Sequence, residues 1–421
     1  MSARLGSLSS TVAVAAASAL LAAMLATAGP AKADSITVNS DQSDPQPKAA
    51  IQEAVHRFEA ANPGTQVTLN TYDHESYKQS IRNWLTSEPP DVVLWYTGTR
   101  LRQFVQPGLL ADVSAIWTAP MKQAFGTTAV DLVTDGGKQY AVPYTQYQWG
   151  LYLRSDILRK AGVGPVKTFD DLLGACDKLN AAGVAPIALG SKDLWPTAAW
   201  FDYLDLRING YASHMQLMSG KVPYTDAKVH AVFAHWKQLL DHKCFNANHT
   251  ELSMQESQSV MYQGRAGMML MGNFITANFS PEMQKVMVFE PFPTVTAGVA
   301  RAEDAPMDSV AIPQGAHNKA GAMKFLAFMM QPDIQAMINA GEKQIPANSQ
   351  AKLIDDPYLI AGRSLLAATP DHSQFFDRDT NEALATLAMK GFQEFMVQPQ
   401  RLDRILAGID RARLRIYANT N

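Results

Sequence analysis

The chain contains the stretch QVTLNTYDHESYKQSIRNWLTSEPPDVVLWYTGT, residues 66–99, which decides the fold. The stretch opens with alternating polar and apolar residues, as in a strand, and it closes on the apolar run 91–95, typical of a strand buried in a parallel sheet. Between the two runs, Tyr77 and Ile81 mark one face of a helix that ends before Pro89. The order strand, helix, strand predicts an α/β fold.

The same alternation continues on both sides of this stretch. A β-branched strand at 35–39 and a helix at 48–61 precede it, which gives two successive strand–helix units and a closing strand. Further strands are expected at 140–143, 183–189, 266–271 and 286–289, and helices at 197–208, 227–240, 319–331, 333–340 and over the last 40 residues. No repeat or long linker divides the chain, so we expect two α/β lobes interwoven through several crossings.

Composition and motifs exclude several classes of function. The sequence is 47% hydrophobic and 18% charged, as in ordinary globular proteins, and its formal net charge is −3 with well-mixed signs. This charge gives no electrostatic reason to expect a nucleic-acid partner or an anionic membrane surface. The sequence has no GxSxG, HExxH, GxxxxGK[ST] or GxGxxG motif, so we expect no enzyme and no cofactor.

The N-terminus is typical of a secretory signal peptide, residues 1–33. Arg4 supplies a positive charge, residues 11–28 are apolar, and Ala31-Lys32-Ala33 provides the small residues of a cleavage site. A retained membrane anchor is the alternative, but the run is rich in alanine and closes on Gly29-Pro30. No cysteine follows the run, so no lipid anchor is expected. The sequence therefore predicts an exported, periplasmic protein.

Only two cysteines are present, Cys176 and Cys244, each in or just after a predicted helix. An oxidising compartment would allow them to pair as a disulfide, and two buried thiols are the alternative. Their separation fits no spacing of metal-binding cysteines, so no metal site is expected.

Eight segments resemble one protein family in the same order along the chain. They are FEAANPGTQVTL (58–69), PPDVVLWYTGT (89–99), GLLADVSAIW (108–117), GGKQYAVPY (136–144), GLYLRSDILRKAGV (150–163), GRAGMMLMGNF (264–274), FEPFP (289–293) and KAGAMKFLAFMMQPDIQ (319–335). Together they resemble family 1 of the extracellular solute-binding proteins, which are mainly carbohydrate-binding components of ABC importers built like maltose-binding protein.

The resemblance implies the type II periplasmic binding protein fold, in which two interwoven α/β lobes meet at a hinge around a central ligand cleft. The expected N-terminal lobe comprises residues 34–145 and 305–350, and the C-terminal lobe comprises 146–304 and 351–421. The implied partners are a carbohydrate ligand and the membrane permease subunits of an importer, and the protein is expected to be a monomer.

Candidate ligand-binding residues follow from where such folds bind. In open α/β sheets the ligand crevice lies beyond the carboxyl ends of the strands. Aromatic rings stack on the C–H face of a sugar, and carboxylates and amides bond its hydroxyls. The residues of these kinds near predicted strand ends are Asp41, His74, Trp95, Tyr96, Tyr144, Gln146, Trp149, Trp195, Asn273, Phe274 and Asp308.

Several of these candidates have a structural alternative. Trp95 ends a strand, where core and cleft are equally compatible with the pattern. His74 fits a solvated loop as well as a sugar contact, and Asp308 fits a structural hydrogen bond. Phe274 stands where many relatives of the family carry a tryptophan, so its contact with the ligand can differ.

Two further features are assigned to structure alone. Trp200 lies on an apolar helical stripe and is predicted to be core. Asp377, Arg378 and Asp379 lie in the segment 374–385, which the family pattern does not predict, and we interpret them as an ion-paired surface turn. Two other functions stay open: a secreted carbohydrate-active hydrolase or lyase, and a receptor for another solute such as a polyamine or a metal.

Overall fold

The structure is a computed structural model that describes residues 1–2 and 34–418. Nearly all of the predicted signal peptide therefore lies outside the described residues. Within them, no helix has both the length and the apolar character that a membrane crossing requires.

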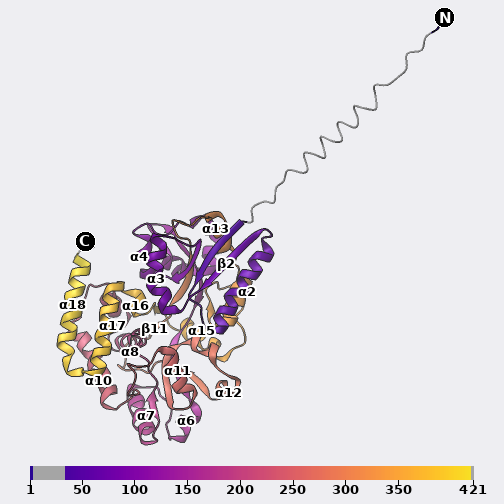
Figure 1. The fold of residues 1–421 in the computed structure, drawn as a ribbon. Coiled ribbons are helices and arrows are strands. Elements are labelled where there is room, and N and C mark those ends of the chain that lie inside the picture. Colours follow the sequence, from indigo (N-terminus) through magenta and orange to yellow (C-terminus); the bar gives the residue numbers. More distant parts are fainter. Residues whose placement is uncertain (3–33, 419–421) are drawn as a thin grey trace.

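The first lobe, in the upper half of Figure 1, is built on a six-stranded mixed sheet. Its strands are β1 (Asp34–Ser40), β2 (Thr65–Thr71), β3 (Val92–Tyr96), β6 (Ala141–Gln146), β12 (Met307–Ala311) and β13 (Ile345–Pro346), and β4 (Thr134–Asp135) and β5 (Lys138–Gln139) form a separate hairpin. Their order in the sheet is β13-β6-β12-β3-β1-β2, with β2 and β3 parallel to β1, and β12 antiparallel to β3 and β6. The helices are α2 (Pro45–Ala61), α3 (His74–Thr86), α4 (Gly98–Val105), α5 (Ala119–Leu132), α13 (Lys319–Met329) and α14 (Pro332–Glu342).

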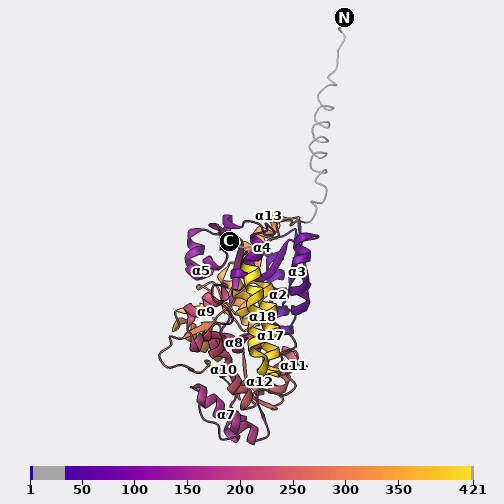
Figure 2. The same cartoon turned by 90° about the vertical axis from the view of Figure 1, so that its left-hand side faces the viewer.

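The second lobe has a four-stranded sheet in the order β10-β7-β9-β8. Its strands are β7 (Trp149–Arg154), β8 (Ala185–Ile187), β9 (Ala266–Gly272) and β10 (Met287–Glu290), and β11 (Ala302–Asp304) pairs separately with β14 (Asp371–Ser373). The helices are α6 (Ser155–Lys160), α7 (Phe169–Ala181), α8 (Trp195–Ile208), α9 (Tyr211–Met218), α10 (Ala227–Asp241), α11 (Met254–Tyr262), α12 (Pro281–Gln284), α15 (Pro357–Ala367), α16 (Phe376–Asp379), α17 (Glu382–Val397) and α18 (Leu402–Ala418). Helices α17 and α18 flank this lobe and face the viewer in Figure 2.

Each lobe buries its own apolar core. In the first lobe, the ring of Phe58 on α2 meets that of Phe325 on α13 edge to face, with centroids 5.1 Å apart. In the second, Phe201 on α8 stacks on Phe392 of α17 at 4.7 Å. Trp200 is 1% exposed, which confirms its prediction as core. The periodic apolar positions seen in the sequence thus face two separate interiors.

The chain passes between the lobes where β6 leads into β7, where β11 leads into β12 and again between β13 and α15. The first two of these crossings touch, because the backbone N–H of Tyr147 donates to the carbonyl of Pro306 at 3.2 Å. All strands of the six-stranded sheet come from 34–146 and 307–346, and those of the four-stranded sheet come from 149–290. We propose that the first lobe comprises residues 34–145 and 305–350 and the second lobe 146–304 and 351–421, as the sequence predicts.

A disulfide joins Cys176 on α7 to Cys244, which follows α10. Both cysteines are fully buried in the core of the second lobe. Of the two alternatives that the sequence left open, the structure contains the paired form.

Candidate functional site

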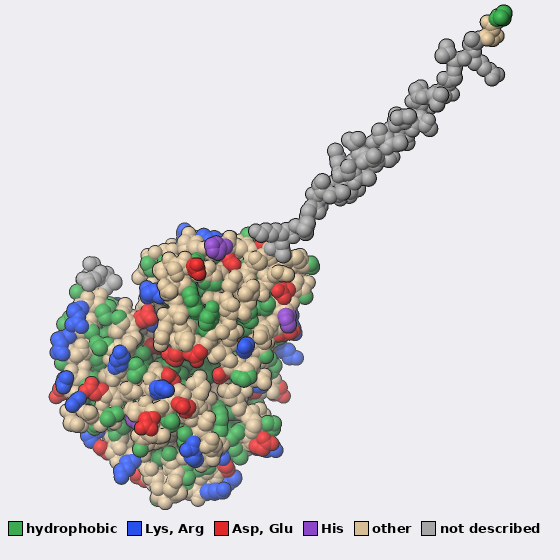
Figure 3. All heavy atoms as spheres, in the orientation of Figure 1, with side chains coloured by type: hydrophobic (Ala, Val, Ile, Leu, Met, Phe, Trp, Pro, Cys, Tyr) green, Lys and Arg blue, Asp and Glu red, His purple; other side chains and the backbone are tan. Residues whose placement is uncertain are grey.

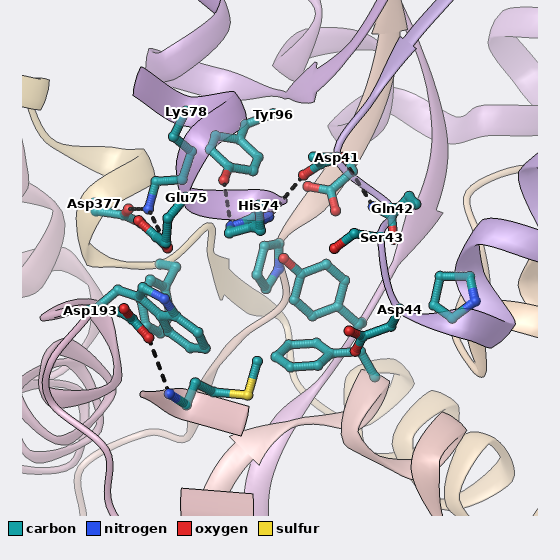
Figure 4. A pocket seen from close by; sticks show the side chains of 18 of the residues that line it. Asp41, Gln42, Ser43, Asp44, His74, Glu75, Lys78, Tyr96, Asp193 and Asp377 are labelled. Carbon is teal, nitrogen blue, oxygen red and sulfur yellow. Dashed lines mark hydrogen bonds and ion pairs between the residues drawn. The ribbon is translucent and has the colours of Figure 1, made fainter. Parts of the chain in front are cut away.

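A cavity of about 380 Å³ lies between the two lobes and is lined by both (Figure 4). Its wall from the first lobe comprises Asp41, Gln42, Ser43, Asp44, Pro47, Asp73, His74, Glu75, Lys78, Tyr96, Pro306, Asp308 and Gln344. Its wall from the second lobe comprises Tyr147, Trp149, Asp193, Trp195, Ser253, Met254, Gln255, Phe274, Phe375, Asp377 and Arg378. Residues just after β1, β2 and β9 and the last residue of β3 are among them, as expected for the carboxyl ends of strands.

Three predicted residues of the first lobe form a hydrogen-bonded chain along one wall (Figure 4). Nδ1 of His74 lies 2.9 Å from Oδ2 of Asp41, and Nε2 lies 3.2 Å from the hydroxyl of Tyr96. Because a carboxylate only accepts, Nδ1 carries the proton, and in the neutral imidazole the tyrosine hydroxyl donates to Nε2. The helix places this imidazole, since His74 opens α3 directly after Asp73, whose carboxylate caps the helix by accepting from the N–H of Ser76 at 3.0 Å. His74 is therefore fixed, not a free loop histidine.

The second lobe supplies a group of aromatic rings. Trp149, the first residue of β7, stacks on Phe375 with centroids 4.6 Å apart and planes inclined by 25°. Trp195, the first residue of α8, and Phe274, just after β9, each meet Trp149 edge to face at 6.0 Å. Trp195 is half-buried, so part of its ring remains open to the cavity. Such a group offers flat apolar surface to the C–H face of a ligand.

The prediction for Arg378 is wrong: it is a buried residue of the cavity wall. Its Nη1 donates to Oδ1 of Asp308 at 2.6 Å, and its guanidinium lies 3.9 Å from the centroid of the Tyr96 ring. A charged triplet in sequence is typical of a surface turn. Here Phe375 and Phe376 are buried, and the ion pair with Asp308, 70 residues away, offsets part of the cost of burying the guanidinium.

In the described part of the chain, the cations that line the cavity are Arg378 and Lys78. Arg100 is buried and pairs with Glu382 of α17 at 3.2 Å. Lys78 lies 3.4 Å from Glu75 and 3.8 Å from Asp377.

Burial governs the protonation of the groups around Arg378. It raises the pKa of Asp308, and the neighbouring guanidinium opposes this rise. It also raises the pKa of the Tyr96 and Tyr147 hydroxyls, which stay neutral and able to donate. Burial alone would lower the pKa of Arg378, but Asp308, the two tyrosines and Asp377 together outweigh it and keep the guanidinium charged.

Four predicted residues do not line the cavity. Trp95 stacks on the ring of Tyr96 with centroids 4.5 Å apart, and its indole N–H donates to the carbonyl of Arg100 at 3.3 Å, so it lies outside the cavity lining. Tyr144 is fully buried on β6, and its hydroxyl reaches only Nε2 of Gln42, at 3.5 Å. The sequence could not separate these positions, because both faces of the strands are covered.

The other two predicted residues outside the cavity lining are Gln146 and Asn273. Nε2 of Gln146 donates to the carbonyl of Ala305 at 3.4 Å, which ties it to the crossing between the lobes. Asn273 is fully buried below the wall, and its neighbour Phe274 takes the place in the cavity.

The sequence reasoning also missed residues that line the cavity. They include Gln42, Asp44, Glu75, Lys78, Gln255, Gln344, Phe375, Asp377 and Arg378. For most of them the sequence carries no signal. The segment 374–385 is different, because its departure from the family pattern marked it as unusual.

The cavity is strongly acidic. Among the described residues, seven carboxylates line it, against the two cations Lys78 and Arg378. The carboxylates are those of Asp41, Asp44, Asp73, Glu75, Asp193, Asp308 and Asp377. Figure 3 shows acidic side chains gathered at the waist between the lobes. Such a lining supplies many hydrogen-bond acceptors and repels anions.

The sequence model of one protein family, the bacterial extracellular solute-binding proteins, matches residues 42–336 of this chain. The chain belongs to this family. The solute-binding protein is 25% identical over 318 residues to an uncharacterised ABC transporter extracellular-binding protein of Pyrococcus horikoshii, a match that covers 74% of this chain and 70% of the relative.

Solved structures agree with the fold of the solute-binding protein. It aligns at a TM-score of 0.87 and 26% identity with the bacterial solute receptor AcbH, described as having an exclusive preference for β-D-galactopyranose, covering 91% of this chain and 100% of that one. A chitin oligosaccharide binding protein aligns at a TM-score of 0.84 and 19% identity, covering 92% and 100%. The predicted family and the predicted two-lobed α/β fold are therefore confirmed.

Proposed function

We propose that this protein captures a hydroxyl-rich sugar or small oligosaccharide between its lobes and delivers it to the membrane subunits of an ABC importer. The observation that carries the proposal is the interlobe cavity, which has rings of Trp149 and Phe375 on one wall and the Asp41–His74–Tyr96 chain on the other. The family and the galactopyranose preference described for AcbH support the same function.

The two walls suit the two kinds of surface on a sugar. The stacked rings present apolar area to the C–H groups. Asp41 and Asp308 accept from hydroxyls, and Arg378 donates to hydroxyl or ring oxygens. Of the residues predicted from sequence, we retain Asp41, His74, Tyr96, Trp149, Trp195, Phe274 and Asp308 as ligand contacts and add Phe375 and Arg378.

Closure of the lobes is the proposed mechanism of capture and delivery. A ligand that touches both walls binds the closed form better than the open form, and it shifts the equilibrium by that difference in affinity. The permease subunits then recognise the closed form. The contact between Tyr147 and Pro306, which brings the first two crossings side by side, supports a hinge at this point.

The receptor is proposed to act in the periplasm as a monomer after removal of residues 1–33, without a cofactor and without changing its ligand. A secreted hydrolase or lyase is the alternative that the family disfavours. Incubation of the purified protein with candidate glycans, followed by chromatography, separates the two. We expect every glycan to remain intact, and released products would contradict the receptor function.

A thermal-shift screen of the mature protein against a carbohydrate panel tests the main proposal. A ligand that binds only the folded state stabilises it by RT ln(1 + [L]/Kd), about 2.7 kcal/mol at one hundred times Kd. We expect at least one neutral mono- or oligosaccharide, D-galactose among those tested, to raise the melting temperature with a saturable dose dependence. If no neutral sugar in the panel raises the melting temperature, the proposal is overturned.

A receptor for a cationic solute is the second candidate, and the excess of carboxylates in the cavity favours it. The same screen should therefore include spermidine and glucosamine, with glucuronate as an anionic control. A shift with spermidine and with no neutral sugar would select the cationic solute. We expect no shift with glucuronate under either function.

A further inference from the structure

One segment, the site loop of residues 374–379, brings both Phe375 and Arg378 into the cavity. Phe375 stacks on Trp149, and Arg378 pairs with Asp308 of the other lobe. The backbone of Phe375 has φ of 112°, a conformation that a non-glycine residue adopts only when its surroundings impose it. Contacts with neighbouring residues must therefore hold the site loop in this conformation.

The group directly below the loop is the carboxylate of Asp202 on α8. Its Oδ2 accepts from the backbone N–H of Phe376 at 2.6 Å. Asp202 is fully buried, although a helix of the core would normally carry an apolar residue at such a position. Within the loop itself, the carboxylate of Asp379 accepts from the N–H of Gln374 at 2.6 Å, which closes the turn on the other side of Phe375.

A buried histidine stands behind Asp202. Nδ1 of His214, on α9, lies 2.9 Å from Oδ2 of Asp205, and its Nε2 lies 3.8 Å from Oδ1 of Asp202. All three members of the row are out of solvent, since Asp202 and His214 are 0% and Asp205 is 2% exposed. The row Asp205–His214–Asp202 leads from the core of the second lobe to the N–H of Phe376.

Two other carboxylates act electrostatically on Asp202 and His214. Asp304 on β11 acts on both Asp202 and His214, and so does Asp379 of the loop. Burial raises the pKa of Asp202 and of Asp304, and the latter rises to about 7. Four carboxylates around one imidazole are costly to bury. Three of them contact the site loop or the residue before it: Asp202 accepts from Phe376, Asp379 accepts from Gln374, and Asp304 accepts from the hydroxyl of Ser373 at 2.5 Å.

We propose that Asp202, backed by His214, is a positioning residue that fixes the site loop and thereby aims Phe375 and Arg378 at the ligand. Neither Asp202 nor His214 lines the cavity, so the effect on binding is indirect. The inference rests on the proposed function for its consequence in sugar affinity, but the hold on the loop itself does not depend on any ligand.

Hydrogen–deuterium exchange of the mature, ligand-free protein tests the hold directly. In the wild type, we expect the amide of Phe376 to exchange as slowly as amides in the buried strand β9. In Asp202→Ala, we expect amides of residues 375–378 to exchange at least tenfold faster. Asp202→Asn keeps an acceptor and should behave like the wild type. A Phe376 amide that exchanges in the wild type like an exposed loop would overturn the proposal even if Asp202→Ala does not fold.

Calorimetry with D-galactose then tests the consequence. We expect Asp202→Ala to lose at least tenfold in affinity, and Asp202→Asn to stay within twofold of the wild type. Asp91→Ala is the matched control, because Asp91 is also buried and accepts backbone N–H groups, from Thr37 and Asn318, but lies outside the cavity lining. It should lose stability without losing affinity.

The two arms separate the possible failures. If the wild type does not bind D-galactose, the choice of ligand in the proposed function fails, and the exchange experiment still decides whether Asp202 holds the loop. If Asp202→Ala binds D-galactose as tightly as the wild type, the positioning role is overturned. The positioning role is equally overturned if Asp91→Ala weakens binding as much as Asp202→Ala does.

Discussion

Arg378 and Asp308 form an ion pair across the two lobes, with Nη1 and Oδ1 2.6 Å apart. Asp308 belongs to β12 in the first lobe, and Arg378 belongs to α16 beside the second. The guanidinium also covers the ring of Tyr96 at 3.9 Å. The pair therefore joins the lobes at the wall of the cavity, where the proposed ligand and lobe closure would both act on it.

Replacing Arg378 should separate ligand affinity from stability. Arg378→Lys keeps the charge but loses the planar fork, so we expect affinity for a sugar found in the screen to fall about tenfold with a small effect on stability. Arg378→Met leaves the carboxylate of Asp308 buried and unpaired, which should cost about 3 kcal/mol of unfolding free energy. Calorimetry and urea denaturation measure the two quantities.

The double variant Arg378→Met with Asp308→Asn is the control for this cycle. Because it removes the unpaired charge, it should recover much of the stability that Arg378→Met loses, but none of the affinity. Full affinity in Arg378→Met would show that the guanidinium does not contact the sugar.

Two tryptophans on α8 should respond in opposite ways. Trp195 lines the cavity and is half-buried, so Trp195→Ala should weaken sugar binding at least tenfold and leave the melting temperature of the free protein nearly unchanged. Trp200 is buried in the core, so Trp200→Phe should lower the melting temperature and leave affinity within twofold. Calorimetry and thermal melting of both variants test the pair, and unchanged affinity in Trp195→Ala would remove that residue from the site.

Stability should fall as pH rises from about 5 to 8. Burial raises the pKa of Asp304 to about 7 and that of Asp379 to about 6. Burial lowers the pKa of His214, but the carboxylates around it, Asp205 first, outweigh this and raise it. In this window the folded state binds more protons than the unfolded state, so the unfolding free energy decreases with increasing pH. Thermal melting across the window should show this slope, and Asp304→Asn should make it shallower. A stability that rises with pH in the wild type would contradict the assignment.

The disulfide should stabilise the second lobe without affecting the site. It closes a loop with a sequence separation of 68, for which the chain-entropy model gives about 4 kcal/mol. We expect the double variant Cys176→Ala, Cys244→Ala to lose up to about 4 kcal/mol of unfolding free energy, measured in urea. Neither cysteine lines the cavity, so affinity for the sugar should stay within twofold. Reductant should destabilise the wild type and have no effect on the double variant.

The sequence by itself determined the secondary structure and the class of fold. Apolar periodicity and turn residues placed the helix of Tyr77 and Ile81 and the strand that contains Trp95, because each element is specified by the residues within it. The ordered family segments indicated two lobes and a cleft, and that fold is confirmed.

Only the tertiary structure decided which side chains reach the cavity. Trp95 and Tyr96 are neighbours on a strand that is buried on both faces, so no alternation in the sequence reveals that Tyr96 alone faces the cleft. The local sequence predicts Arg378 as a surface charge, because its partner Asp308 is distant in sequence and only the fold places the two in contact. Burial of a charge depends on its partner, and long-range pairing is set by packing, not by local sequence.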